Sequence, residues 1–153
     1  MSLKRLSLLV ALSSVVACGK NVCSVDGMGA DGGTEVGQRV YFEFDRPKPG
    51  QKAALNADQK ELAKATADAV KSSKDMIIAE GHCDRMGSDE YNDALGERRA
   101  DAVKKSLIDN GVAADRVEVR SMGKRAQPNP NANTPEEDAL NRVVIVKRMA
   151  ARG

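Results

Sequence analysis

Residues 80–100 read EGHCDRMGSDEYNDALGERRA, and this stretch decides the fold. A short apolar run over residues 76–79 precedes it and stops at charged and polar residues, as expected of a strand that ends at the edge of a sheet. A glycine-containing turn follows. Ser88 can then cap a helix that continues to about Asn110, where Gly111 is placed to end it. The stretch therefore predicts a buried strand, a turn and a long helix.

Arg99 occupies a core position of this helix. At 100° per residue, one side of the helix carries the apolar residues Tyr91, Leu95, Ala102, Val103 and Leu107. Arg99 lies four residues after Leu95 and four before Val103, in the middle of that side. A buried guanidinium without a partner is very costly, so we expect an acceptor nearby. Asp84, just before the helix, is one candidate.

Two interpretations of Asp84 and Arg99 are possible. In the first, they form a permanent salt bridge. In the second, both face one ligand, whose carboxylate binds Arg99 through two parallel hydrogen bonds and whose ammonium binds Asp84. An amino acid head group presents both of these charges.

Strands and helices alternate along the rest of the chain. The expected strands cover residues 39–45, 75–81, 116–120 and 143–146. A helix is expected from Asn56, with Gln59 completing a capping box, and a short helix from Thr134, with Glu137 in the same role.

The inner side of the first helix is expected to carry Leu62, Ala65 and Ala69. Two of the strands alternate polar with apolar residues and two do not, so we expect the helices to cover mainly one face of the sheet. The predicted fold class is α+β: a two-layer α/β sandwich with a small mixed four-stranded sheet, two main helices and one short helix. The strand order is left open.

The chain begins with the pattern of an export signal. Lys4 and Arg5 precede an 11-residue apolar stretch over residues 6–16, which is too short to cross a bilayer. The segment that ends at Cys18 resembles a bacterial lipobox. That resemblance implies a lipoprotein signal peptide over residues 1–17 and a lipidated cysteine after it. An ordinary signal peptide with an incidental cysteine is the alternative.

Residues 18–38 are expected to form the lipidated cysteine and a flexible, glycine-rich linker, followed by a domain over 39–148 and a tail over 149–153. Acyl chains on Cys18 would anchor the protein firmly in a membrane. In lipoproteins of this type an Asp after the cysteine indicates retention at the inner membrane, so Gly19 fits the outer membrane.

The composition argues against several classes of protein. The 24 basic and 22 acidic residues become 22 of each once the leader, with its two basic residues, is removed. No concentrated basic surface is indicated, and with two Tyr, two Phe and no Trp there is no stacking platform for single strands. Nucleic acid is therefore not an expected partner.

Cys83 invites a metal interpretation because it lies between His82 and Asp84. However, successive side chains of a strand point to opposite faces, and no second cluster of ligands is present, so no metal site and no cofactor are expected. A small buried residue is the favoured interpretation of Cys83. Whether Cys83 forms a disulfide with Cys23 is left open.

One long motif resembles a known family. Residues 80–112, a turn at 122–124 and Asn141-Arg142-Val143-Val144 are similar to the OmpA-like peptidoglycan-binding domain over about residues 39–148. With the lipobox and linker, the whole chain resembles the peptidoglycan-associated lipoproteins (Pal). Val143 stands where family members usually have a second arginine after Asn-Arg.

The resemblance implies that Asp84 and Arg99 bind diaminopimelate in the stem peptide of peptidoglycan. It also implies groove roles for Phe44, Asp45, Asn92, Asn141 and Arg142. Tyr91 is expected to be mainly a core residue, and Asn92 to fix the loop by hydrogen bonding.

The resulting expectation is a non-enzymatic outer-membrane lipoprotein with a periplasmic domain that binds peptidoglycan. Its expected partners are TolB-like and TolA-like proteins of a Tol-Pal system that supports envelope integrity and cell division. An alternative is a periplasmic partner-binding module outside a Tol system. A hydrolase that uses Glu80, His82 and Asp84 is disfavoured, because no nucleophile–base pair is indicated.

Overall fold

The computed structural model describes residues 33–51 and 53–149 of the chain. The elements in chain order are β1 (Thr34–Glu35), β2 (Val40–Tyr41), α1 (Ala57–Val70), β3 (Met76–His82), α2 (Asp89–Asp109), a 3₁₀ turn (Ala114–Arg116), β4 (Val117–Gly123), α3 (Pro135–Ala139) and β5 (Val143–Met149). Within the described ranges no helix has the length and apolarity needed to cross a membrane. The predicted leader, Cys18 and Cys23 lie outside these ranges.

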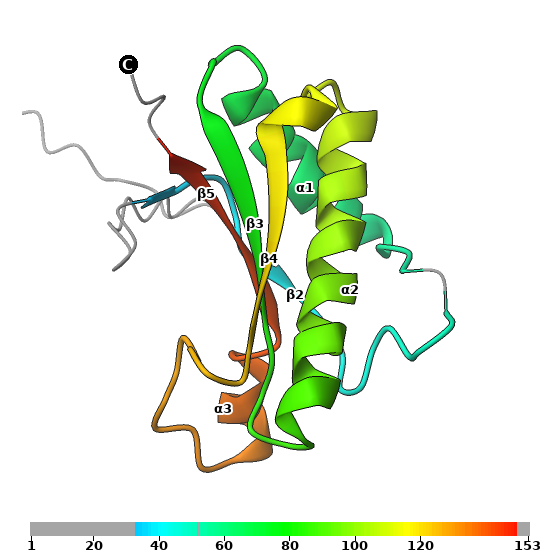
Figure 1. The fold of residues 1–153 in the computed structure, drawn as a ribbon, viewed down its shortest axis with the longest axis vertical. Helices are drawn as coiled ribbons and strands as arrows, with labels where there is room; N and C mark the ends of the chain where they lie inside the picture. Colours follow the sequence, from blue (N-terminus) through cyan, green and yellow to red (C-terminus); the bar gives the residue numbers. More distant parts are fainter. Residues whose placement is uncertain (1–32, 52, 150–153) are drawn as a thin grey trace, which may run out of the picture.

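All strands belong to one mixed sheet with β3 at its centre (Figure 1). β3 runs parallel to β4 and antiparallel to β5. β1 and β2 both pair with the other side of β5, one after the other, so five strands occupy four positions. This confirms the predicted α+β class with its mixed sheet and three helices, although the sheet has five strands instead of four.

Three boundaries differ from the prediction. The strand expected over 39–45 is only Val40–Tyr41, because the chain turns away at residues 44 and 45. β1 lies inside the segment predicted to be a flexible linker, and Gly33 is buried against β5. The segment from Gly33 to Gln38 therefore belongs to the folded domain. At the other end, β5 continues through Met149, the first residue of the predicted tail.

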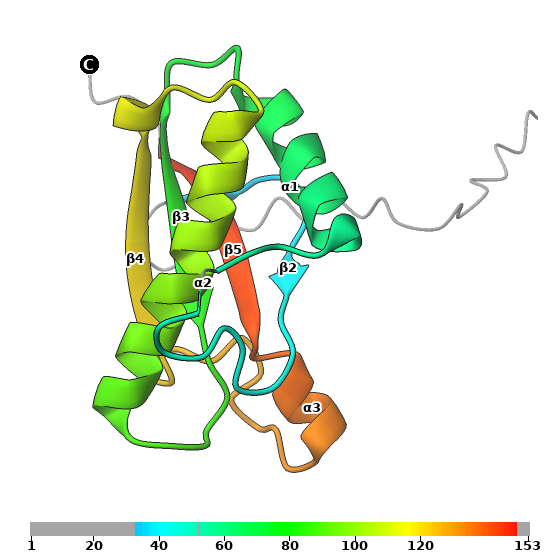
Figure 2. The ribbon, with the colours of Figure 1, turned by 90° about the vertical axis from the view of Figure 1, so that its right-hand side faces the viewer.

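Helices α1 and α2 cover one face of the sheet, and α3 lies at one end of it (Figures 1 and 2). The predicted caps are confirmed. Capping boxes begin α1 at Asn56 and α3 at Thr134, and Ser88 caps α2. Gly111 follows α2 with φ +100°, a left-handed conformation that suits glycine.

The inner side of α1 was predicted only in part. Leu62 is partly buried and packs against the core, as expected. Ala65 and Ala69 are exposed, and the buried residues are Ala63, Thr66, Ala67 and Val70. Alanine occurs on several sides of this helix, so its apolar pattern does not single out one side. Val70 and the contacts with the sheet determine the orientation of the helix.

α2 approaches β3 very closely. A Cβ atom on Gly81 would lie 1.9 Å from the carbonyl oxygen of Gly96, and a Cβ atom on Gly96 would lie 2.4 Å from Ser121 Oγ. The absence of a side chain at both glycines lets the two backbones meet. This contact fixes the height of α2 above the sheet, and with it the position of Arg99 beside the end of β3.

Candidate functional site

Three chain segments meet at one end of the sheet: the end of β3, the start of β5 and the loop after β2. The loop after β2, the turn after β3 and the first turns of α2 line a hollow of about 220 Å³. Arg142, which precedes β5, does not line the hollow but contacts Asp84 in its wall. Its lining residues are Phe44, Asp45, Asp84, Met86, Gly87, Tyr91, Asn92, Leu95 and Arg99. The hollow thus combines two carboxylates and a guanidinium with apolar side chains.

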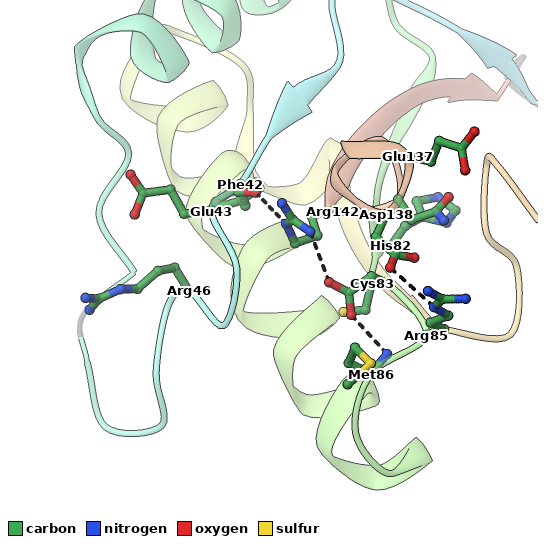
Figure 3. Close-up of polar contacts among 12 residues, drawn as sticks. Phe42, Glu43, Arg46, His82, Cys83, Arg85, Met86, Glu137, Asp138 and Arg142 are labelled. Atoms are coloured by element: carbon green, nitrogen blue, oxygen red, sulfur yellow. Dashed lines mark hydrogen bonds and ion pairs between the residues drawn. The ribbon is translucent and has the colours of Figure 1, made fainter. Parts of the chain in front are cut away.

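Asp84 lies in the wall of the hollow and is only 5% exposed. Its Oδ1 accepts a hydrogen bond from the backbone N–H of Met86 at 3.1 Å, which fixes the turn after β3. Its Oδ2 pairs with Arg142 Nη1 at 3.2 Å (Figure 3). The permanent Asp84–Arg99 salt bridge considered from the sequence is therefore wrong. The counter-ion of Asp84 comes from a residue 58 positions later in the chain.

Arg99 is fully buried, as its place in the apolar side of α2 predicted. Its donors are matched by backbone carbonyls: Nε binds the oxygen of Arg46 at 2.8 Å, Nη1 that of His82 at 3.1 Å and Nη2 that of Glu43 at 3.2 Å. Nη1 also contacts Cys83 Sγ at 3.6 Å.

These contacts tie the loop after β2 to the end of β3. Burial lowers the pKa of the Arg99 guanidinium, yet arginine remains charged in proteins. The guanidinium lies 5.5 Å from the centre of the Phe42 ring. Arg99 therefore supplies a fixed positive charge at the base of the hollow.

Arg142, just before β5, contacts Phe42 in the segment after β2 as well as Asp84 after β3. Its Nε donates to the carbonyl oxygen of Phe42 at 3.2 Å (Figure 3). Its guanidinium lies 5.9 Å from the centre of the Phe44 ring. Phe44 itself is 60% exposed, so this arginine lies under a solvent-facing ring. Sequence periodicity gave no sign of the contact with Asp84, because no local spacing relates the two residues.

Tyr91 and Asp45 also line the hollow and are joined by a hydrogen bond. Asp45 has φ +52°, which places it in the left-handed region that Asp tolerates better than most residues. The Tyr91 hydroxyl donates to Asp45 Oδ1, and this hydrogen bond raises the pKa of Tyr91. Tyr91 is partly exposed here and is not the core residue that was predicted.

Two asparagines predicted to belong to the groove hold its loops together. Asn92 is 1% exposed and donates to the carbonyl oxygens of Met86 and Ser88, at 2.8 and 3.0 Å, which confirms its loop-fixing role. Asn141 has no exposed surface and exchanges two hydrogen bonds with the backbone of Asn129. Asn141 does not line the hollow, whereas Asn92 forms part of its wall.

Several residues of the site were not anticipated from the sequence. Met86 is 57% exposed and, like Phe44, lines the hollow. Arg85 pairs with Asp138 of α3 at 3.3 Å, which links α3 to the turn after β3 (Figure 3). Met86 could have been noticed in the sequence as a candidate site residue, because it is an apolar residue in a turn that has no core to pack against.

The residues of the hydrolase alternative have structural partners. Glu80 is 1% exposed and pairs with Lys147 at 2.8 Å and Arg120 at 3.4 Å. His82 Nδ1 binds the carbonyl oxygen of Ala126 at 2.6 Å, and burial lowers the pKa of its imidazole. Glu80 and His82 are on the sheet face away from α1 and α2, so neither lines the hollow.

Cys83 is a buried free cysteine whose thiol donates weakly to the carbonyl oxygen of Asn92 at 3.4 Å. Burial raises the pKa of the Cys83 thiol to about 11. Across residues 33–51 and 53–149, no group of three His, Cys, Asp or Glu side chains is placed to hold a metal ion.

Sequence similarity connects the chain to one protein family. The model of the OmpA family matches residues 48–142. The chain is 37% identical over 136 residues to the peptidoglycan-associated lipoprotein of Pseudomonas aeruginosa, covering 85% of this chain and 74% of that protein. It is 32% identical over 114 residues to outer membrane protein A of Escherichia fergusonii, covering 72% of this chain and 43% of that protein.

The structure is similar to the crystal structure of the peptidoglycan-associated lipoprotein from Burkholderia pseudomallei. The TM-score is 0.63 at 29% identity, and the match covers 72% of this chain and 89% of that one. The family model spans more than half of the chain and includes both Asp84 and Arg99. The chain belongs to the OmpA family and resembles its peptidoglycan-associated lipoproteins.

Proposed function

We propose that this protein is an outer-membrane lipoprotein that binds peptidoglycan without covalent attachment and tethers the membrane to the cell wall. The lipid is carried by Cys18, and the folded domain, which includes β1, lies in the periplasm. The names of its relatives support this proposal, and so does the chemistry of the hollow. The protein acts as a binding module and not as an enzyme.

The hollow binds the free amino acid end of diaminopimelate in the stem peptide. The observation that carries this proposal is a hollow lined by Asp84, Arg99 and the apolar side chains of Phe44 and Met86, with Arg142 paired to Asp84. The ligand's ammonium binds Asp84, while Arg99 and Arg142 provide positive charge for its carboxylate. The methylene chain of the ligand packs between the exposed side chains of Phe44 and Met86.

The remaining site residues support this arrangement. Asp45 adds negative charge beside the position of the ammonium and is held by Tyr91. Asn92 keeps the turn after β3 in place, and Asn141 holds the loop before α3. One small head group recognised at a water-exposed hollow gives moderate and reversible binding.

In the cell, we place the protein in a Tol-Pal system, with TolB-like and TolA-like partners and a role in envelope integrity and cell division. The similarity to peptidoglycan-associated lipoproteins from two Pseudomonas species supports this assignment. A periplasmic partner-binding module outside a Tol system is the second candidate, because similarity to outer membrane protein A is nearly as high.

Sedimentation with purified sacculi tests the proposal. The full chain, purified in detergent, is expected to sediment with sacculi. Asp84→Asn removes the charge that binds the ammonium, so its apparent Kd should rise by about 10- to 100-fold, the equivalent of roughly 1.5–3 kcal/mol for a charged hydrogen bond. Asp101→Asn makes the same change on the exposed side of α2 and should bind like the parent.

Equal sedimentation of Asp84→Asn and Asp101→Asn would refute the assignment of the site. Release of soluble muropeptides during incubation would instead indicate a hydrolase.

A further inference from the structure

Arg142 differs from Arg99 in how firmly it is held. Arg99 has no exposed surface, and three backbone carbonyls and one thiol bind its guanidinium. Arg142 makes two hydrogen bonds with described residues, to Asp84 and to the Phe42 carbonyl, out of five N–H groups. Its side chain is 14% exposed. Of the two arginines, Arg142 is therefore the one that can change partner.

We propose that Arg142 is an exchangeable counter-ion of Asp84. When an amino acid head group enters the hollow, its ammonium replaces the Arg142 guanidinium on Asp84 Oδ2, and the released guanidinium binds the carboxylate of the same ligand. This inference rests on the proposed function, because it concerns the same hollow and the same class of ligand.

The geometry of Asp84 explains why the exchange involves one oxygen. Oδ1 is held by the backbone N–H of Met86, so the turn keeps its shape whichever cation binds Oδ2. The Asp84 and Arg142 side chains are 8% and 14% exposed, so an unpaired charge at either one would be costly. A ligand that carries both charges leaves neither residue unpaired.

The exchange makes the hollow selective for the charge state of its ligand. A ligand that carries an ammonium but no carboxylate would displace Arg142 and leave it without a partner, so the Asp84–Arg142 pair resists such a ligand. Diaminopimelate with a free carboxyl group is therefore accepted. Diaminopimelate with that carboxyl group amidated is rejected, although it has almost the same shape.

Titration calorimetry with two muropeptides tests this selectivity. Both carry a stem peptide that ends in diaminopimelate, and the carboxyl group beside its free ammonium is either free or amidated. The full chain is expected to bind the free form at least about tenfold more tightly, the effect of one charge-assisted pair. This comparison needs no variant, so it does not depend on the folding of one.

Arg142→Gln removes the counter-ion. Its preference for the free form should fall to about twofold or less, and it should bind the amidated muropeptide more tightly than the parent chain does, because Asp84 no longer has a competing partner. A gain of binding is not expected from structural damage. Arg142→Lys keeps the charge and should keep the preference. Arg148→Gln, at the other end of β5, is the matched control and should behave like the parent.

Three results separate the possible failures. Equal affinity of the parent chain for both muropeptides would overturn the exchange and leave peptidoglycan binding intact. A tenfold preference that survives in Arg142→Gln would overturn the role of Arg142. Failure of the parent chain to bind either muropeptide would overturn both the exchange and the proposed function.

Discussion

Replacing Gly81 by alanine should separate α2 from the sheet. The new Cβ would lie 1.9 Å from the carbonyl oxygen of Gly96, whereas ordinary van der Waals contact begins at 3.4 Å, so the two backbones would have to move apart by about 1.5 Å. The three atoms nearest the new methyl group all belong to the backbone of Gly96, so no change of rotamer can relieve the clash.

Overpacking in cores typically costs about 1–3 kcal/mol, and a backbone clash belongs at the upper end or beyond. We therefore expect Gly81→Ala to lower the free energy of unfolding by about 3 kcal/mol or more, out of roughly 5–15 kcal/mol for a domain. For a domain of this size, that corresponds to a decrease in Tm of about 10 °C.

Urea and thermal unfolding of the full chain, followed by circular dichroism, measure this change. Gly50→Ala is the control, because a Cβ atom on Gly50 meets no described atom within 4 Å. The backbone of Gly50 is left-handed, with φ +75°, so this substitution carries a conformational cost but no clash. The control should lose only about 1 kcal/mol, the cost of a left-handed alanine. If Gly81→Ala is no less stable than Gly50→Ala, the close contact between α2 and β3 does not determine the position of the helix.

Two further predictions concern titratable groups. Burial lowers the pKa of His82 from its ordinary value of about 6.5, so the unfolded chain binds the proton more readily than the folded chain does. The free energy of unfolding should therefore be constant above about pH 7. It should decrease as the pH falls through about 6.5 and below. His82 is the only histidine of the chain, so urea unfolding between about pH 7.5 and 5.5 reports mainly on this group, and a rise in stability on acidification would contradict the sign. Burial raises the pKa of Cys83 to about 11, so in a Cys18→Ser/Cys23→Ser variant a thiol reagent at pH 8 should react with Cys83 only after unfolding in urea. Rapid labelling of the native variant would show that the thiol is accessible.

The sequence predicted those parts of the fold that depend on local spacing. The capping boxes at Asn56 and Thr134, the helix from Ser88 and the buried position of Arg99 all follow from residues within one or two turns of each other. The inner side of α1 was not predictable in this way, because Ala65 and Ala67 are equally apolar and only the contacts with the sheet distinguish them.

The ion pair between Asp84 and Arg142 could not be predicted from local spacing. Asp84 and Arg99 are 15 residues apart and belong to neighbouring elements, so proximity in sequence favoured that pair. The structure pairs Asp84 with Arg142 because the end of β3 lies beside the start of β5, which only the strand order determines. Once that antiparallel pairing is known, the contact is expected.

The two short strands along β5 have a mechanical consequence. From Thr34 to Phe42 the chain runs antiparallel to β5, with hydrogen bonds at β1, at Val36, at β2 and at Phe42. The chain enters this edge beside Arg148, at the end of β5 opposite the hollow. A pull between Gly33 and a ligand in the hollow would act along the strands and load these bonds together in shear, so that they would have to rupture as a group and could not peel apart one by one.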